Sequence, residues 1–385
     1  MLASRFRPNL MVGSLFMIVF VMGADSFIIS PLLPVLAQQF HVTIGHTALA
    51  VTSYAVGYAA GAPFFGPLGD RYPKKILLLI GCGVFVTGSL ACALTSTLIG
   101  FIFARLVAGI GAALTLPNVW ATLGEHFSGN RLAHVMGMTM AALSLSIAIG
   151  VPLGAWVTQL TNWRLVFYGL IGMAMLAGTG VIIWVPMLRL VKREPLNYWE
   201  SFKKVWHLKT VILALGVNFV WMLGFYSIYT FLGSKIALSW HFSTGQTGLV
   251  FVAYGLSNFS ASFFSGVVTT KLGAAKSVYL NGWLSVGCLL GLIFSHQWLI
   301  GFIISLMGLA LVQGLGVPAL STYLVAHAQN QRTTVMALNS AVLYLGLSLG
   351  SWLGGLYYPI GGFTVIVWFA IVMQSLAAGL GHLLC

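Results

Sequence analysis

The sequence predicts an all-α membrane protein with twelve transmembrane helices in two pseudo-symmetric six-helix bundles. Three observations predict this fold: an apolar composition, twelve long apolar runs, and a repeat that relates the two halves of the chain. Of the 385 residues, 59% are hydrophobic and only 6% are charged, whereas an ordinary soluble domain is about 25% charged. So few charges cannot cover a water-exposed surface, which excludes a soluble enzyme, a nucleic-acid-binding domain and a disordered chain.

Apolar runs separated by short polar breaks give the expected spans, because about 20 apolar residues cross a bilayer. The twelve runs are 9–33, 44–67, 75–94, 97–123, 132–157, 163–186, 210–232, 245–269, 276–295, 297–326, 333–356 and 361–383. They predict an N-terminal bundle (1–187), a cytoplasmic amphipathic linker (188–209) and a C-terminal bundle (210–385). The linker mixes basic and aromatic residues, which is typical of a helix lying on anionic lipid.

The basic residues explain the net charge of +13 without a nucleic-acid partner. They gather at the ends of apolar runs, where Lys and Arg set membrane topology. With both termini in the cytoplasm, only Arg164 and Lys235 lie outside, and only Arg105 lies within a span. The pattern predicts a multi-pass protein of the cell (inner) membrane, acting as a monomer in the lipid bilayer.

Motifs for cofactor chemistry are missing from the sequence. The cysteines, Cys82, Cys92, Cys288 and Cys385, have no paired or metal-ligand spacing. No Walker-type motif, H-E-x-x-H motif, paired carboxylates or histidine cluster occurs. We therefore expect no cofactor, no metal and no catalytic site, and a membrane enzyme is disfavoured.

An internal repeat appears at an offset of 200 residues. Gly150-Val-Pro-Leu-Gly154 recurs as Gly350-Ser-Trp-Leu-Gly354, and Val135-Met136 recurs as Val335-Met336. The segment 66–75 has a weaker copy at 266–276, in which Thr270 replaces Asp70. Two six-span halves in parallel repeat are typical of a transporter whose site lies between them.

Several segments resemble signatures of the major facilitator superfamily. They are Gly66–Lys75 after span 2 (with Pro73 where the family has a second glycine), Arg105–Gly111 in span 4, Gly150–Gly154 in span 5 and Trp163–Phe167 at span 6. Span 1, with Asp25 before Leu-Leu-Pro34, is similar to the bacterial drug and sugar efflux permeases of the arabinose-efflux-permease-like group. The resemblance implies the two-bundle fold of that superfamily, a span-4 arginine associated with proton transfer, and a span-5 motif linked to sealing the two halves in antiporters.

Asp25 and Arg105 are the candidates for proton coupling. The chain has five acidic residues, and Asp25 alone lies within an apolar run. A charge near the bilayer centre costs at least about 2.5–3.5 kcal/mol, so it needs a partner, water or a proton. Asp25 is expected to bind protons and to face a cationic or polar substrate; a purely structural carboxylate is the alternative. If Arg105 touched Asp25, it would oppose protonation, and coupling would require the two to separate during the cycle.

The loop after span 2 and the middle of span 5 are candidates for gating. Gly66 allows close helix approach and Asp70 faces a helix N-terminus or a cation, while Arg71, Lys74 and Lys75 are able to pair with Glu125. Such contacts, present in one state and broken in the other, would bias alternating access. Gly150, Pro152 and Gly154 should perturb span 5 and permit close packing. A topology signal and a simple kink remain the alternatives.

The expected substrate site lies between the halves and combines aromatic rings with a few amides. Its candidate residues are Asn118, Trp120, Asn218, Trp221, Tyr226, Tyr229, Tyr254, Asn258, Gln313 and Asn339. Such a lining suits an amphipathic organic solute. The leading hypothesis is proton-coupled export (antiport) of small lipophilic or amphipathic compounds by alternating access. Export of sugars, nucleosides or another metabolite stays open, as does an uncoupled facilitator or channel.

Overall fold

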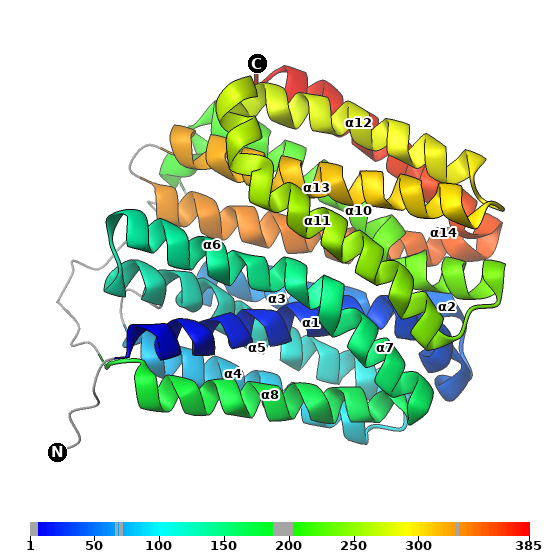
Figure 1. The fold of residues 1–385 in the computed structure, drawn as a ribbon, viewed down its shortest axis with the longest axis horizontal. Helices are drawn as coiled ribbons and strands as arrows, with labels where there is room; N and C mark the ends of the chain where they lie inside the picture. The colour runs from blue at the N-terminus through cyan, green and yellow to red at the C-terminus, as the bar shows by residue number, and fades with distance from the viewer. Residues whose placement is uncertain (1–6, 66–67, 69–71, 188–202, 329–330) are drawn as a thin grey trace.

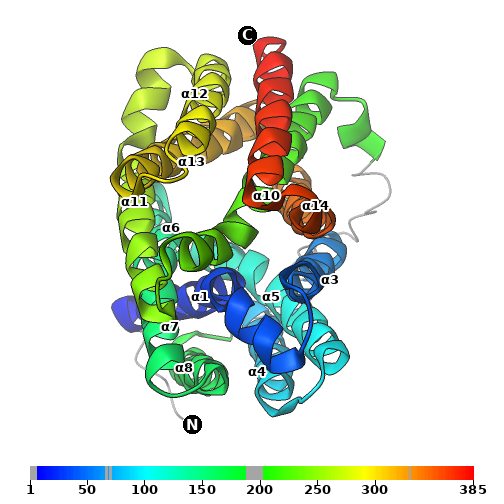
Figure 2. The same cartoon turned by 90° about the vertical axis from the view of Figure 1, so that its right-hand side faces the viewer.

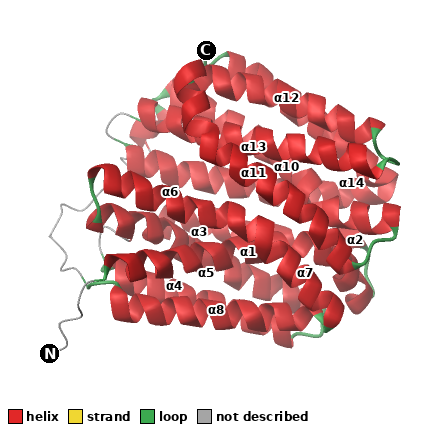
Figure 3. Ribbon diagram, viewed as in Figure 1, coloured by secondary structure: helices red, strands yellow, loops and turns green. Residues whose placement is uncertain are grey.

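The computed structural model describes residues 7–65, 68, 72–187, 203–328 and 331–385. The described part of the chain is built from helices (Figures 1 and 3). They are α1 (Pro8–Phe40), α2 (Ile44–Thr47), α3 (Leu49–Phe65), α4 (Lys74–Leu94), α5 (Leu98–His126), α6 (Gly129–Leu145), η2 (Ser146–Gly150), α7 (Val151–Leu160), α8 (Trp163–Trp184), α10 (Lys209–Trp240), α11 (Thr244–Leu272), α12 (Ala274–Phe294), α13 (Leu299–His327) and α14 (Arg332–His382). The predicted all-α membrane fold is confirmed.

Eleven helices of the described chain are long and apolar enough to cross a membrane, and the longest of them, α14, supplies two spans. Its helical geometry fails at Gly361 (φ −153°) and Gly362 (φ 63°). A positive φ is the conformation that glycine adopts without strain. The chain turns back at this point, so α14 contains the predicted spans 333–356 and 361–383.

Two predicted spans are interrupted. The span predicted at 44–67 begins with the separate short helix α2 before α3. The span predicted at 132–157 contains the π-helical turn η2 between α6 and α7. Pro152 is the second residue after this turn; proline lacks an N–H and its ring clashes with the carbonyl group four residues earlier. A π-turn is one way in which a helix absorbs such a defect.

The helices form two bundles, α1–α8 and α10–α14, which Figure 2 shows end-on. We call the end where α1 and α10 begin the linker face; it lies on the left in Figure 1. At the opposite face, α1 and α10 are each followed directly by a histidine in the left-handed conformation, His41 (φ 54°) and His241 (φ 51°). The exact boundaries at 187, 188, 209 and 210 stay predictions, since 188–202 lies outside the described residues.

Contacts between the bundles gather in the half of the molecule toward the opposite face. The Ser30 hydroxyl of α1 donates to the Tyr229 carbonyl of α10 (2.6 Å) and accepts from the Gly233 N–H (3.2 Å). Gln159 of α7 accepts from the Ser243 hydroxyl (2.9 Å) and the Gly245 N–H (2.8 Å). The two bundles are therefore joined near the ends of α1, α7 and α10.

We call these contacts between the bundles the closure. Small residues allow it to form at two places, between α2 and α14 and between α7 and α11. A Cβ on Gly355 would lie 2.9 Å from the Gly45 carbonyl oxygen, so these two backbones touch. A Cβ on Gly248 of α11 would lie 2.8 Å from that of Ala155 on α7. Side chains at these glycines would hold the bundles apart, because small residues are what allows helices to approach this closely.

Candidate functional site

Asp25 and Arg105 form an ion pair in the interior of the first bundle. Both side chains are 0% exposed. Arg105 Nη1 donates to both carboxylate oxygens of Asp25, at 2.7 Å each. Hydrogen bonds between ionised groups at this length are among the strong ones in proteins. Two charges predicted to be embedded in separate spans are therefore each other's partner.

Neighbouring groups occupy the rest of the Arg105 guanidinium. Its Nη2 donates to the Asp25 carbonyl (3.3 Å) and its Nε donates to the Ala50 carbonyl of α3 (3.4 Å). The Tyr54 ring, also on α3, lies against its flat face, with Cζ 4.3 Å from the ring centroid. Three helices, α1, α3 and α5, thus converge on one buried cation.

The structure places Asp25 away from the cavity between the bundles, so the expectation that it faces the substrate stays a prediction. Its carboxylate points into the first bundle toward Arg105, whereas the adjacent Ser26 and Phe27 line the cavity between the bundles. Neighbouring residues on a helix point about 100° apart, so the rotation of α1 that brings Ser26 to the cavity turns Asp25 away. In this conformation the ion pair and the cavity lie on different sides of α1.

An aromatic cluster fills the centre of the molecule between the bundles. Tyr229 contacts Phe27, Phe251 and Tyr254, with ring centroids 5.2, 5.6 and 5.6 Å apart. Tyr226 joins through Phe27 at 6.5 Å. The structure therefore brings together three of the predicted substrate residues, Tyr226, Tyr229 and Tyr254, and adds Phe27 from the opposite bundle. The hydroxyl group of Tyr229 is buried without a hydrogen-bond partner.

The cavity beside this cluster is small. It measures about 10 Å³ and is lined by Ser26, Phe27, Ser30, Val51, Tyr226, Tyr229, Thr230 and Leu347. That is about the space of one water molecule, whereas sites for small organic molecules measure about 300–1,000 Å³. The bundles have to separate before an organic solute fits here.

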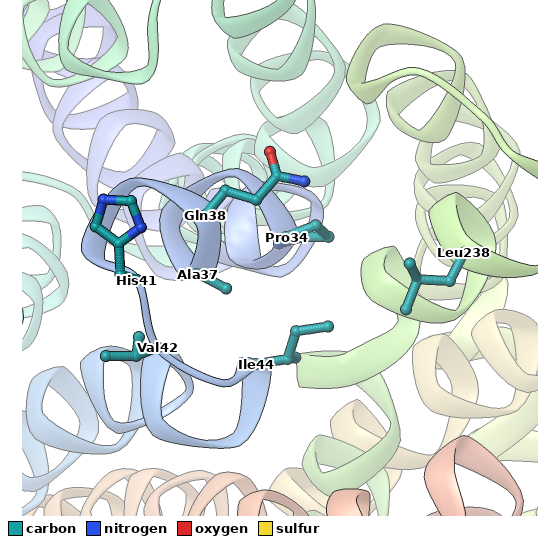
Figure 4. A pocket seen from close by; sticks show the side chains of 7 residues that line it. All are labelled: Pro34, Ala37, Gln38, His41, Val42, Ile44 and Leu238. Atoms are coloured by element: carbon teal, nitrogen blue, oxygen red, sulfur yellow. The ribbon is translucent and has the colours of Figure 1, made fainter.

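A larger hollow lies beyond the closure, at the opposite face (Figure 4). Its volume is about 480 Å³, and it is lined by Pro34, Ala37, Gln38, His41, Val42, Ile44 and Leu238. The contact of Ser30 with Tyr229 and Gly233 lies between this hollow and the central cavity. None of the predicted substrate residues lines it.

The remaining predicted substrate residues are dispersed. Asn218 donates to the Asn339 side chain (2.7 Å), and Asn258 accepts from Ser144 of the other bundle (3.2 Å). Three others pack within one bundle: Asn118 donates to the Leu114 carbonyl, Gln313 contacts Met222, and the Trp221 ring lies against Gly316. Trp120 is partly buried and packs against the hydrophobic core. In the described chain, no ring contact joins Trp120 or Trp221 to the tyrosine cluster.

One of the predicted pairings at the linker face is present. Lys74, at the start of α4, forms an ion pair with Glu125 near the end of α5. Lys75 instead donates to the Ile182 carbonyl of α8 at 2.6 Å, because successive helical residues point in different directions. Gly66, Asp70 and Arg71 lie outside the described residues, so their roles stay predictions.

The motif in the middle of span 5 contacts both bundles. Cβ atoms on Gly150 and Gly154 would meet Ala24 (2.8 Å) and Ile28 (2.5 Å) of α1. The Pro152 backbone lies against Gly248 of α11, in the second bundle. The close packing predicted for this motif is present, and it places α7 between α1 and α11.

Sequence reasoning missed the closure residues Ser30, Gln159 and Gly233. A repeat signal marks the same region: Phe40-His-Val-Thr-Ile-Gly-His-Thr47 recurs as Trp240-His-Phe-Ser-Thr-Gly-Gln-Thr247 at an offset of 200. A second signal is Leu-Ile-Gly-Phe-Ile, which opens both α5 and α13. The first of these repeats holds both left-handed histidines and both close-contact glycines, Gly45 and Gly245.

Comparisons with known proteins agree with this architecture. The family model described as Major Facilitator Superfamily matches residues 15–234 and 214–384. An uncharacterized MFS-type transporter, YwfA of Bacillus subtilis, is 30% identical over 366 residues, covering 93% of this chain and 88% of that protein. A chloramphenicol resistance protein of Pseudomonas aeruginosa is 27% identical over 322 residues (77% and 70%).

A solved structure shares the fold. The crystal structure of the human organic anion transporter MFSD10 (TETRAN) matches with a TM-score of 0.77 at 18% identity, covering 97% of this chain and all of that one. Two bundles of helices around a central closure, with the family match over nearly the whole chain, define a membrane transporter rather than an enzyme. The chain belongs to the major facilitator superfamily, and its relatives include bacterial efflux-type proteins.

Proposed function

We propose that this transporter exports small lipophilic or amphipathic organic compounds in exchange for protons. One observation carries the proposal: the carboxylate of Asp25 is fully buried in the membrane-spanning region and paired with Arg105. The other acidic residues occupy positions 70, 125, 194 and 200, and Glu125 lies near the end of α5 with its side chain 39% exposed. Asp25 is therefore the carboxylate suited to carry a proton through the membrane.

The ion pair links protonation of Asp25 to the conformation of the transporter. While Arg105 touches Asp25, the attraction between them opposes protonation. A movement that separates the pair removes this opposition, and removal from water favours the neutral carboxylic acid. Because α1 and α5 belong to the same bundle, proton binding on one side and release on the other require α1 to move relative to α5 within the first bundle, in step with the rocking of the two bundles.

The driving force is sufficient for export. One charge crossing 100 mV contributes about 2.3 kcal/mol, equivalent to a concentration ratio of about fiftyfold. In this proposal the organic solute binds in the enlarged central cavity against Phe27, Tyr226, Tyr229 and Tyr254. The chloramphenicol resistance protein among the relatives supports an organic solute of this kind.

The orientation belongs to the same proposal. Basic residues at helix ends gather on the linker face, including Lys74, Arg131, Lys209, Lys276 and Arg332. By the positive-inside rule the linker face is cytoplasmic, with both termini inside the cell membrane. The closure at Ser30 and Gln159 then shuts the outer side, and the transporter works as a monomer in which Lys74–Glu125 and the span-5 motif bias the exchange between states.

Purified protein in proteoliposomes tests the proposal. Chloramphenicol, a lipophilic dye, a sugar and a nucleoside are offered at an imposed pH gradient, with proton movement followed by an internal pH dye. We expect chloramphenicol or the dye to move protons in the wild type, and Asp25→Asn to abolish that movement while solute exchange continues. Normal proton movement in Asp25→Asn refutes the coupling role; transport of the sugar or nucleoside alone favours a metabolite exporter, and transport without proton movement an uncoupled facilitator.

A further inference from the structure

We propose that Tyr54 is a positioning residue that holds the Arg105 guanidinium in place whenever Asp25 carries a proton. The proposal rests on the proton-coupling role of Asp25. It adds the group that stabilises the charge of Arg105 when Asp25 is protonated. A buried charge without a partner strongly destabilises a folded protein. Protonation of Asp25 creates this situation, because Arg105 keeps its charge and loses its ionic partner.

The contacts of Arg105 show what is left once Asp25 is neutral. Two of its hydrogen bonds go to the Asp25 carboxylate and weaken on protonation. Its bonds to the Asp25 and Ala50 carbonyls remain, as does the contact with the Tyr54 ring at 4.3 Å. The face of an aromatic ring is the negative end of its quadrupole, so it attracts a cation without needing a charge of its own.

Helix α3 is built to supply this support. Ala50 and Tyr54 are one helical turn apart and therefore lie on the same face of α3, toward Arg105. Tyr54 is 1% exposed, so the ring is held by packing and water does not compete for the guanidinium. One turn further along, Tyr58 points to the second bundle and stacks on Tyr344, with ring centroids 3.6 Å apart. Tyr54 thus contacts Arg105 whereas Tyr58 does not, and both tyrosines lie near Tyr344.

The titratable groups around Asp25 show how a change at Tyr54 reaches its carboxylate. The titratable groups that interact electrostatically with Asp25 come from four other helices: Tyr54 of α3, Cys92 of α4, Arg105 of α5 and Tyr344 of α14. Arg105 is the one basic group among them. Tyr54 is itself among these groups, so a change at Tyr54 acts on Asp25 both directly and through Arg105, and Tyr54→Phe, which removes only the hydroxyl group, separates the two effects.

The test is a spectroscopic titration of the full-length protein in lipid nanodiscs, without any solute. The infrared carbonyl band of the protonated carboxyl group is followed with pH and assigned to Asp25 by its loss in Asp25→Asn. The ring contacts Arg105 in both protonation states, so the midpoint shifts only by the part of the cation–π attraction that is gained when the carboxylate no longer competes for the guanidinium, at most about thirtyfold for a desolvated contact. In Tyr54→Leu we therefore expect the midpoint of the band to fall, by no more than about 1.5 pH units.

Two matched variants separate positioning from packing. Tyr54→Phe keeps the ring and should keep the wild-type midpoint. Tyr58→Leu removes an equally buried tyrosine from the same helix without touching Arg105, and should also keep it. Tyr54→Met replaces Tyr54→Leu if that variant does not fold, because methionine fills irregular space well.

The outcomes are distinct. An unchanged midpoint in Tyr54→Leu or Tyr54→Met, or an equal fall in Tyr58→Leu, overturns the role of Tyr54 and leaves the proposed function standing. If no Asp25 band titrates in the wild type, the coupling role of Asp25 fails and the role of Tyr54 fails with it.

Discussion

Replacing Gly233 with alanine should open the closure at the opposite face. A Cβ at this position would lie 2.5 Å from Pro31 Cα, whereas ordinary contacts begin near 3.4 Å. The helices α1 and α10 must therefore separate by roughly 0.9 Å (3.4 − 2.5). That movement also disturbs the hydrogen bonds of Ser30 to Tyr229 and Gly233.

The magnitude follows from the cost of overpacking. An added methyl group in a tightly packed contact costs about 1–3 kcal/mol. In the proposed transport cycle the two bundles that Gly233 joins separate, so opening should relieve the strain more readily than unfolding does. The ratio of open to closed molecules at this face should rise about fivefold to 150-fold, since 1.4 kcal/mol is a factor of ten.

Distances between spin labels measure this ratio. Labels at Gln38→Cys on α1 and Leu238→Cys on α10 lie on exposed positions beyond the closure, in a background from which the four native cysteines have been removed. We expect Gly233→Ala to increase the long-distance population. Gly216→Ala is the matched control, because it lies on the same helix and its Cβ would meet nothing within 4 Å. A wild-type distribution in Gly233→Ala, or an equal shift in Gly216→Ala, refutes the reasoning.

Three further outcomes follow from the contacts. Tyr229→Phe should lower solute affinity about fivefold to tenfold without lowering the melting temperature, because the hydroxyl group is buried with no partner until a solute arrives; unchanged affinity in a binding titration contradicts this. Lys74→Gln and Glu125→Gln should each change the transport rate by no more than about fivefold, since a partly exposed ion pair contributes about 0–1 kcal/mol; a much larger loss in the double variant than in either single one would exclude a simple pair. Gly316→Ala should lower the melting temperature in detergent by forcing a methyl group against the Trp221 ring, whereas Gly287→Ala, with open space around it, should not; equal melting of the two variants would contradict the packing.

The apolar runs predict the fold well because the bilayer leaves few alternatives. Backbone polar groups in lipid must be satisfied within the chain, so an apolar run long enough to cross becomes a helix. The same runs do not predict where helices end. The first span was expected to end at residue 33, but α1 continues through Pro34 to Phe40, because packing against neighbours rather than hydropathy sets this end of the helix.

The candidate site was predictable only in part. Asp25 and Arg105 stand out because charges within apolar runs are rare. Their contact joins residues 80 positions apart, and no local spacing reports the rotation of α1 that turns Asp25 into the first bundle. Gly233 was missed for a different reason: the chain has 45 glycines, and composition alone does not mark which of them lies against a partner helix.

The repeat shows which side chains replace the ion pair at the corresponding positions of the second half. At the offset of 200, Asp25 corresponds to Phe225 and Tyr54 to Tyr254, both in the central aromatic cluster. At the offset that aligns α5 with α13, Arg105 corresponds to Leu306, which is buried and apolar. The positions that hold an ion pair in the first half thus hold aromatic and aliphatic side chains in the second. An ion pair buried in both halves would incur the desolvation penalty twice. The division therefore agrees with the proposed function, in which the first half holds the titratable group and the second half supplies most of the aromatic surface for the solute.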